Sequence, residues 1–237
     1  MEHKQSKRIQ TSVLNGIEKK ALVAIANRLP LWVTSDMLTL IGTIGAVIIA
    51  VGYLLSSYDI NFLWLASFGL LVNWYGDSLD GTLARVRNIQ RPVYGFFIDH
   101  MMDCFNETIM FVGIGLSPLL DLRLSLLVLV FYLLLSVYVY ISSQLKCEFK
   151  LTYAKMGPTE FRALVIIVNT LVMYVTPLRE FSAELSVFGA VHEFTIFDIV
   201  AVLLIVLLAI LLLVSFIHDA REYAKIDPPK KNDPSDK

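Results

Sequence analysis

The sequence predicts an all-α integral membrane protein, a bundle of six transmembrane helices preceded by an amphipathic helix on the membrane surface. Of its 237 residues, 56% are hydrophobic, and the mean hydropathy of +0.65 is too high for an ordinary soluble domain. A helix needs about 20 mostly apolar residues to cross the hydrocarbon core of a membrane. The predicted spans are 34–55, 60–85, 93–117, 123–146, 159–177 and 195–217.

The residues before the spans predict a surface helix. Apolar side chains recur at helical spacing within residues 12–29, and Pro30 ends the pattern. They are Val13, Ile17, Leu22, Ile25 and Leu29. A helix in a soluble core would look similar, but the neighbouring span favours a helix that lies on the membrane.

Three regions follow from this pattern. Residues 1–33 form a cytoplasmic N-terminus with the juxtamembrane helix, and residues 34–217 form the six-helix transmembrane domain. Residues 218–237 are expected to be a disordered cytoplasmic tail, because they are polar and rich in lysine, aspartate and proline.

The basic residues predict the orientation. The protein has 20 lysines and arginines, and all but Arg123 and Arg179 lie before the first span, around the second or fourth connection, or after the last span. Cytoplasmic loops carry an excess of Lys and Arg. We therefore expect a multi-pass protein with both termini and the polar ends of spans two and three in the cytoplasm, in the inner membrane if the protein is bacterial.

Residues 76–104, GDSLDGTLARVRNIQRPVYGFFIDHMMDC, are unusually polar for a membrane domain. Each charge at a helix centre costs roughly 2.5–3.5 kcal/mol on an insertion scale. Asp77, Asp80, Gly81 and Ala84 nevertheless fall on one helical face, because they are three, four and seven residues apart. Two carboxylates thus lie beside two small residues, which leave room for a ligand or a second backbone.

The third span repeats this arrangement. Gly95, Asp99, Asp103 and Glu107 recur every four residues and share one face. Packing the two stripes together predicts an acidic pocket, in which unpaired carboxylates would repel one another. Oxygen ligands of this kind suit Mg2+ or Mn2+, and several of them could hold two ions. Glu107 is either an accessory acid or a helix-stabilising contact.

Two alternatives explain the same charges. The acids could form structural salt bridges with Arg85, Arg87 and Arg91, although this would not explain the small residues on the acidic face. Intramembrane acids also line the pathways of ion and solute transporters. Transporters more often have internal repeats and broken helices at the membrane midplane, whereas these acids cluster toward one side.

The pattern resembles the signature of the CDP-alcohol phosphotransferase family, in its bacterial single-domain form: Asp77-x2-Asp80-Gly81-x2-Ala84-Arg85-x9-Gly95-x3-Asp99-x3-Asp103. Members move a substituted phosphate from a CDP-linked donor to an alcohol and release CMP. The resemblance implies a phospholipid-synthesising transferase that uses CDP-diacylglycerol. The alternative within the family is a CDP-amino-alcohol phosphotransferase that acts on a lipid alcohol.

The resemblance also implies roles for individual residues. Asp77, Asp80, Asp99 and Asp103 would hold the two ions of Mg2+ or Mn2+, and Asp103 would also be the general base. The donor nucleotide would contact Asp77, Gly81, Ala84, Arg85 and Gly95. The expected partners are the CDP-linked lipid donor, a small alcohol acceptor and membrane lipids; no nucleic acid is expected, and a homodimer stays open.

The acceptor is less constrained by the sequence. Family members that bind a phosphorylated acceptor use basic groups near the mouth of the fifth span, which makes Lys155 and Arg162 candidates for acceptor binding. Each of the two alone would serve equally well as an anchor at the membrane interface. His100, directly after Asp99, resembles the choline and ethanolamine phosphotransferase branch, yet Phe96 stands where that branch usually has Glu. Inositol, inositol phosphate, glycerol 3-phosphate, serine and an amino-alcohol donor all stay open.

Overall fold

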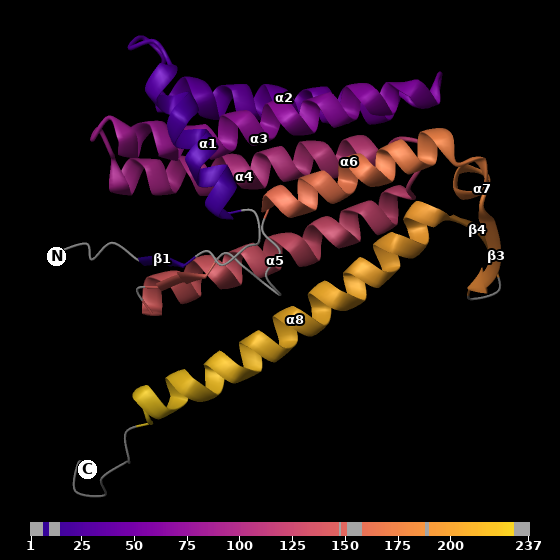
Figure 1. The fold of residues 1–237 in the computed structure, drawn as a ribbon. Coiled ribbons are helices and arrows are strands. Elements are labelled where there is room, and N and C mark those ends of the chain that lie inside the picture. The colour runs from indigo at the N-terminus through magenta and orange to yellow at the C-terminus, as the bar shows by residue number, and fades with distance from the viewer. Residues whose placement is uncertain (1–6, 10–14, 147, 151–157, 188–189, 230–237) are drawn as a thin grey trace, which may run out of the picture.

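The computed structural model describes residues 7–9, 15–146, 148–150, 158–187 and 190–229. Long helices lie side by side and alternate in direction, and the last one diverges from the others toward its C-terminal end (Figure 1). These long helices are α2 (Ser35–Leu55), α3 (Leu63–Val86), α4 (Pro92–Gly115), α5 (Leu122–Lys146), α6 (Pro158–Tyr174) and α8 (Ile196–Ile226). Each lies where the sequence predicts an apolar helix.

Among the described residues, α2, α5 and α8 are long and apolar enough to cross a membrane. The acidic residues of α3 and α4 make these two helices less apolar, and α6 has only 17 residues. The structure thus fits a largely helical membrane protein, and the crossing of the membrane by all six helices stays a prediction.

Local sequence signals explain where the helices begin. The Thr34 side chain accepts a hydrogen bond from the backbone N–H of Met37 (3.2 Å) and so caps α2. A capping box of Thr195 and Asp198 starts α8. Pro92 is the first residue of α4. Proline suits this position because the first N–H of a helix has no partner within the helix, so its absence costs no hydrogen bond.

Two predicted ends were wrong. The fifth span was expected to continue to residue 177, but α6 ends at Tyr174 and a short helix, α7 (Thr176–Arg179), follows. Pro177 explains the break, because it cannot donate a hydrogen bond to the preceding turn and its ring clashes there. In contrast, α8 continues beyond residue 217 to Ile226, so the first part of the expected disordered tail is helical.

The extension of α8 has a compositional reason. Residues 218–226 include Ala, Arg, Glu and Lys, which are favourable in helices. Asp227 caps the end, and Pro228 follows it, where the helix can no longer continue. Residues 230–237 of the predicted tail lie outside the described residues.

Four short strands accompany the helices in the described part of the chain, and the structure stays largely helical, as predicted. β1 (Lys7–Ile9) pairs in parallel with β2 (Glu148–Lys150), and β3 (Ser182–Val187) pairs with β4 (Ala190–Thr195) in an antiparallel hairpin. The sequence of β3 alternates polar with apolar or small residues, which is a strand period and not a helical one.

Helix α1 (Asn15–Arg28) lies within the predicted amphipathic segment and packs against the C-terminal half of α3. Leu22 and Ala26 are buried with Leu79 and Leu83. Ile25 and Leu29 pack partly buried against the same cluster, as the apolar pattern predicts, while Val13 lies outside the described residues. The contact of α1 with a membrane surface stays a prediction.

Glycines let α2 and α3 pack backbone to backbone. A Cβ atom on Gly76 would overlap the backbone of Gly42 and Leu38, and one on Gly45 would overlap Asn73. Small residues at such positions allow close helix approach in membrane proteins. This contact presses the turn of α3 that follows Gly76 directly onto α2, and that turn carries Asp77 and Asp80.

Candidate functional site

Three of the four predicted metal-binding aspartates lie together where α3 and α4 face each other. Asp77 comes from α3, and Asp99 and Asp103 come from successive turns of α4. Each offers a carboxylate oxygen, and these oxygens lie within 4.8 Å of one another. The stripes predicted from helical spacing therefore do face the same space.

Asp80 lies on the same cavity and is held in place by α2. The hydroxyl of Thr39 donates to Asp80 Oδ2 (2.8 Å), and the backbone N–H of Gly81 donates to Oδ1. Ser35 donates to the Asp80 carbonyl (2.9 Å). The residue is only 8% exposed. These contacts fix the direction of its carboxylate.

The cavity between these carboxylates is small and polar. It has a volume of about 10 Å³, enough for roughly one water-sized particle. Its lining consists of Thr39, Gly42, Asp77, Asp80, Asp99, Met102, Asp103 and Asn106. The Oδ1 atom of Asn106 is buried and has no hydrogen-bond partner within the described part of the chain. A set of carboxylates with an unused amide oxygen fits a hard divalent cation, because such ions prefer oxygen ligands.

Arg162 brings a third helix to the site. Its Nη2 lies 2.7 Å from Asp77 Oδ2, and the two side chains are 18% and 26% exposed. The sequence placed Arg162 near the acceptor and did not predict this ion pair. In the structure, the guanidinium from α6 neutralises one of the four carboxylates.

One arginine of the salt-bridge alternative, Arg87, bonds to backbone carbonyl oxygens. Arg87 donates to the carbonyl oxygens of Leu29, Pro30 and Val33 at 2.9, 2.9 and 2.6 Å. It thereby ties the end of α3 to the connection between α1 and α2. The salt-bridge alternative therefore does not account for Arg87.

The residues expected to contact the nucleotide lie on the C-terminal half of α3 and in the first turn of α4. Arg85 donates to the Thr82 hydroxyl (3.0 Å), and its guanidinium lies over Gly81, where an added Cβ would be 3.3 Å from Nη1. Gly95 is exposed, and a Cβ there would meet no atom within 4 Å. Ala84 is partly exposed on the same helix as Arg85.

A tight turn sets the distance between the two halves of the motif. The Ala84 carbonyl accepts a hydrogen bond from the N–H of Ile89 (3.0 Å), and the Arg85 carbonyl accepts one from Asn88 (3.2 Å). This is a Schellman ending, with Asn88 in the left-handed region at φ 56°. Helix α4 can therefore begin at Pro92, and Asp99 returns to the level of Asp80.

The candidate acceptor residues are not all brought together. The ring of His100 packs against Phe96 and Tyr140, with centroids 4.1 and 4.2 Å away. Its Nδ1 donates to the Phe96 carbonyl (2.8 Å), since a carbonyl can only accept. Asp99 lies 3.7 Å from the same nitrogen, too far for a hydrogen bond. Lys155 lies outside the described residues.

Sequence reasoning missed three residues near the site. Thr39 and Asn106 line the cavity, and Glu18 of α1 accepts hydrogen bonds from Trp74 Nε1 (2.9 Å) and the Thr159 hydroxyl (2.6 Å). Asn106 follows Asp103 by three residues, so helical spacing could have placed it on the acidic face. Thr39 and Glu18 come from other helices, and no spacing rule connects them to the motif.

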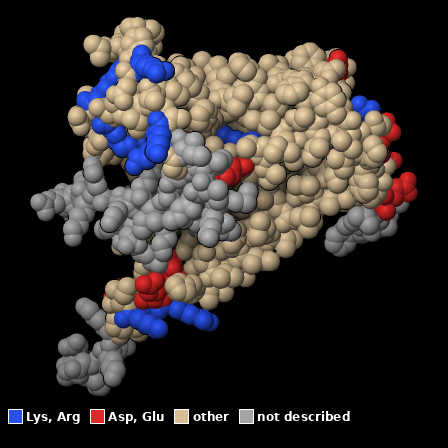
Figure 2. All heavy atoms as spheres, viewed as in Figure 1, with Lys and Arg blue, Asp and Glu red and all other residues tan. Residues whose placement is uncertain are grey.

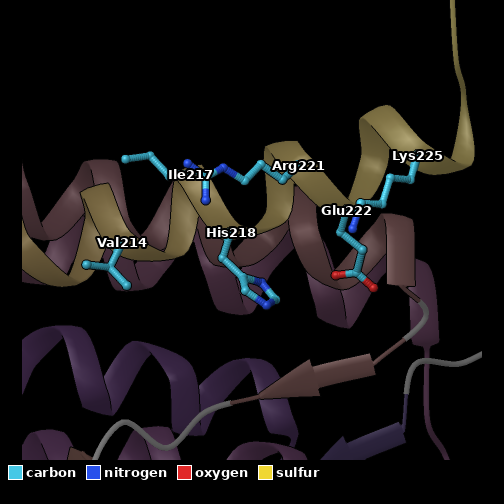
Figure 3. Close-up of a pocket in the computed structure, with 6 residues that line it drawn as sticks. All are labelled: Val214, Ile217, His218, Arg221, Glu222 and Lys225. Atoms are coloured by element: carbon cyan, nitrogen blue, oxygen red, sulfur yellow. The ribbon is translucent and has the colours of Figure 1, made fainter.

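A second group of possible metal ligands lies on α8. His218, Asp219 and Glu222 offer atoms within 4.8 Å of one another. His218 and Glu222 border a larger, open cavity of about 570 Å³, where Val214, His218 and Glu222 project from the same side of the helix (Figure 3).

The hydrogen bonds of Asp219 explain this second group. Asp219 Oδ2 accepts from the Tyr138 hydroxyl (2.7 Å) and from Ser142 (3.3 Å), and His218 Nδ1 lies 3.1 Å from Oδ1. The buried carboxylate thus ties α8 to α5. The carboxylates of α3 and α4 are therefore the stronger candidate for a functional metal site.

Comparison with known proteins gives one relevant relative. The chain matches no protein-family model. A segment of 84 residues is 36% identical to the phosphatidylinositol phosphate synthase of Cutibacterium acnes and covers 35% of this chain and 38% of that protein. The chain thus matches little more than a third of the length of this relative. Over that segment it is similar to a phospholipid-synthesising transferase of the CDP-alcohol phosphotransferase family.

Proposed function

We propose that the protein is a metal-dependent CDP-alcohol phosphotransferase. It would move the substituted phosphate of a CDP-linked lipid, CDP-diacylglycerol, to a small alcohol and release CMP. The observation that carries this proposal is the meeting of four aspartates from α3 and α4 around one cavity. Their spacing in the sequence and the similarity to the Cutibacterium acnes enzyme support the same reaction class.

The four aspartates are the proposed holders of Mg2+ or Mn2+. Asp77, Asp99 and Asp103 present converging oxygens, and Asp80 is fixed beside them by Thr39. When bound, divalent cations neutralise a pyrophosphate and stabilise the charge that develops on the departing CMP phosphate. The aspartates cannot do this alone, because their own charge would repel the donor.

Asp103 is the proposed general base. In the reaction, the acceptor oxygen forms a bond with the phosphorus that carries the lipid, and the bond from that phosphorus to the CMP oxygen breaks. The proton of the acceptor hydroxyl would pass to the Asp103 carboxylate, which lies at the cavity on α4. Arg85 would contact a donor phosphate, and Gly81, Ala84 and Gly95 would leave space for the nucleotide.

A phosphorylated acceptor is the proposed second substrate. Arg162 lies within the acidic cluster and carries the charge-assisted donors that a phosphate needs. The relative is named for the synthesis of phosphatidylinositol phosphate, which agrees with such an acceptor. His100 and Lys155 are retained as acceptor contacts. An uncharged acceptor, or an amino-alcohol donor used with a lipid alcohol, is the competing choice.

The proposed orientation places the acidic site on the cytoplasmic side, with six crossings. Figure 2 shows Lys and Arg side chains gathered at the end of the bundle that holds α1 and the connection between α3 and α4. Most of the charged side chains visible at the opposite end, near the β3–β4 hairpin, are acidic. This distribution supports the positive-inside orientation. It would give the site access to a soluble nucleotide product.

Release of CMP by the purified protein tests the proposal. With CDP-diacylglycerol and a panel of alcohols, activity should disappear with a chelator and return with Mg2+ or Mn2+. Asp99→Asn should abolish it, whereas Asp36→Asn, an exposed aspartate near the start of α2, should retain it. Full activity in chelator would contradict the metal-dependent reaction. Cation flux without CMP release would favour a transporter.

A further inference from the structure

Asn106 lines the acidic cavity. It lies on α4 three residues after Asp103, on the same side of the helix, and it is only 6% exposed. Its Oδ1 atom has no hydrogen-bond partner among the described residues. A buried amide oxygen that has lost its water and gained no partner is unfavourable. The position of Asn106 therefore needs an explanation.

Asn169 shows one way in which the bundle satisfies a buried asparagine, whereas Asn73 Oδ1, away from the cavity, also has no hydrogen-bond partner among the described residues. Asn169 on α6 is fully buried, donates to the Ser67 hydroxyl (3.2 Å) and accepts from the Tyr53 hydroxyl (3.1 Å). Both ends of that amide are used by protein groups. Asn106 differs because it borders a cavity with four carboxylates, and the missing partner of its oxygen would occupy that cavity.

The chemistry of the cavity restricts this partner. Carboxylates repel an anion, and about 10 Å³ leaves room for only one small particle. A hard cation suits both conditions and takes amide carbonyl oxygens as ligands. A neutral ligand adds coordination without adding to the repulsion between the carboxylates.

We propose that Asn106 supplies its amide oxygen as an additional, neutral ligand to the divalent cation held by the acidic site. The inference rests on the proposed function, which places that cation among Asp77, Asp80, Asp99 and Asp103. Asn106 would lower the dissociation constant of the cation and would select ions that accept oxygen ligands.

Binding of Mn2+ without substrates tests this role separately from activity. Free Mn2+ can be measured by electron paramagnetic resonance during titration of the purified protein. Asn106→Leu keeps a similar volume and removes the oxygen, so the dissociation constant should rise by about tenfold or more. Asn106→Asp keeps an oxygen and should bind Mn2+ at least as tightly as the unaltered protein. Asn169→Leu, the matched buried control, should leave the dissociation constant unchanged.

The outcomes separate this inference from the proposed function. If the unaltered protein binds no Mn2+ at the site, both the metal-dependent reaction and the role of Asn106 are wrong. If it binds Mn2+ and Asn106→Leu binds equally well, the proposed function stands and the role of Asn106 is wrong. Weaker binding by Asn106→Asp would also overturn this role, and this variant remains informative where the leucine variant does not fold.

Discussion

Arg162 and a divalent cation should compete for Asp77. The 2.7 Å contact between Arg162 Nη2 and Asp77 Oδ2 is a charge-assisted hydrogen bond between side chains that are 18% and 26% exposed. Such a bond contributes about 1.5–3 kcal/mol. A cation that takes Asp77 as a ligand must weaken the bond between Arg162 and Asp77. Arg162 therefore raises the free energy of the cation-bound protein relative to the cation-free protein. Its removal also makes the pocket more negative.

Arg162→Ala should therefore bind Mn2+ more tightly than the unaltered protein. Full loss of the competing bond would lower the dissociation constant by about 10- to 150-fold, and partial solvation of the pair favours the lower end. Titration of the substrate-free protein measures the change. Arg179→Ala is the control, because Arg179 lies on α7 and pairs with Glu180 instead. Weaker Mn2+ binding by Arg162→Ala would refute competition and would mean that Arg162 holds the carboxylates in their binding arrangement.

Three further predictions follow from contacts in and around the site. With a phosphorylated acceptor, Arg162→Ala should raise the acceptor KM by about 10- to 150-fold and the donor KM far less; equal small changes would contradict a role for Arg162 in acceptor binding. Gly76→Ala should lower the stability by about 1–3 kcal/mol, because its Cβ would overlap the backbone of Gly42. Gly16→Ala, with no atom within 4 Å of the new Cβ, should not lower it, and equal thermal unfolding temperatures would refute the packing argument. A cysteine introduced as Arg91→Cys in an otherwise cysteine-free variant should react only with reagents on the cytoplasmic side; labelling from outside would reverse the orientation.

Much of the helix arrangement was predictable because apolar length and helical spacing are local properties. The six long helices lie where the sequence places them, and the stripes of Asp77 with Asp80 and of Asp99 with Asp103 face one cavity. A fixed spacing within each helix leaves few ways to bring these acids together. The α3–α4 turn, with its Schellman ending at Asn88, sets the remaining distance.

Contacts between distant helices could not be read from local patterns. Thr39 reaches Asp80 from α2, and Arg162 reaches Asp77 from α6, because glycine-mediated packing and helix order set these distances. The strands also escaped prediction, since β1 and β2 pair across 141 positions of the sequence, from Lys7 to Glu148. Spacing rules carry no information about such pairs.

The protein is proposed to transfer the lipid-bearing phosphate of CDP-diacylglycerol to an alcohol at the acidic cavity. The most direct test measures CMP and the new phospholipid in the same reaction. Purified protein in lipid vesicles should consume CDP-diacylglycerol and form CMP and a new phospholipid in equal amounts when Mg2+ and the matching alcohol are present. Asp80→Ala should abolish both products while the protein stays folded. Unchanged product formation by Asp80→Ala, or CMP release without a new phospholipid, would contradict the claim.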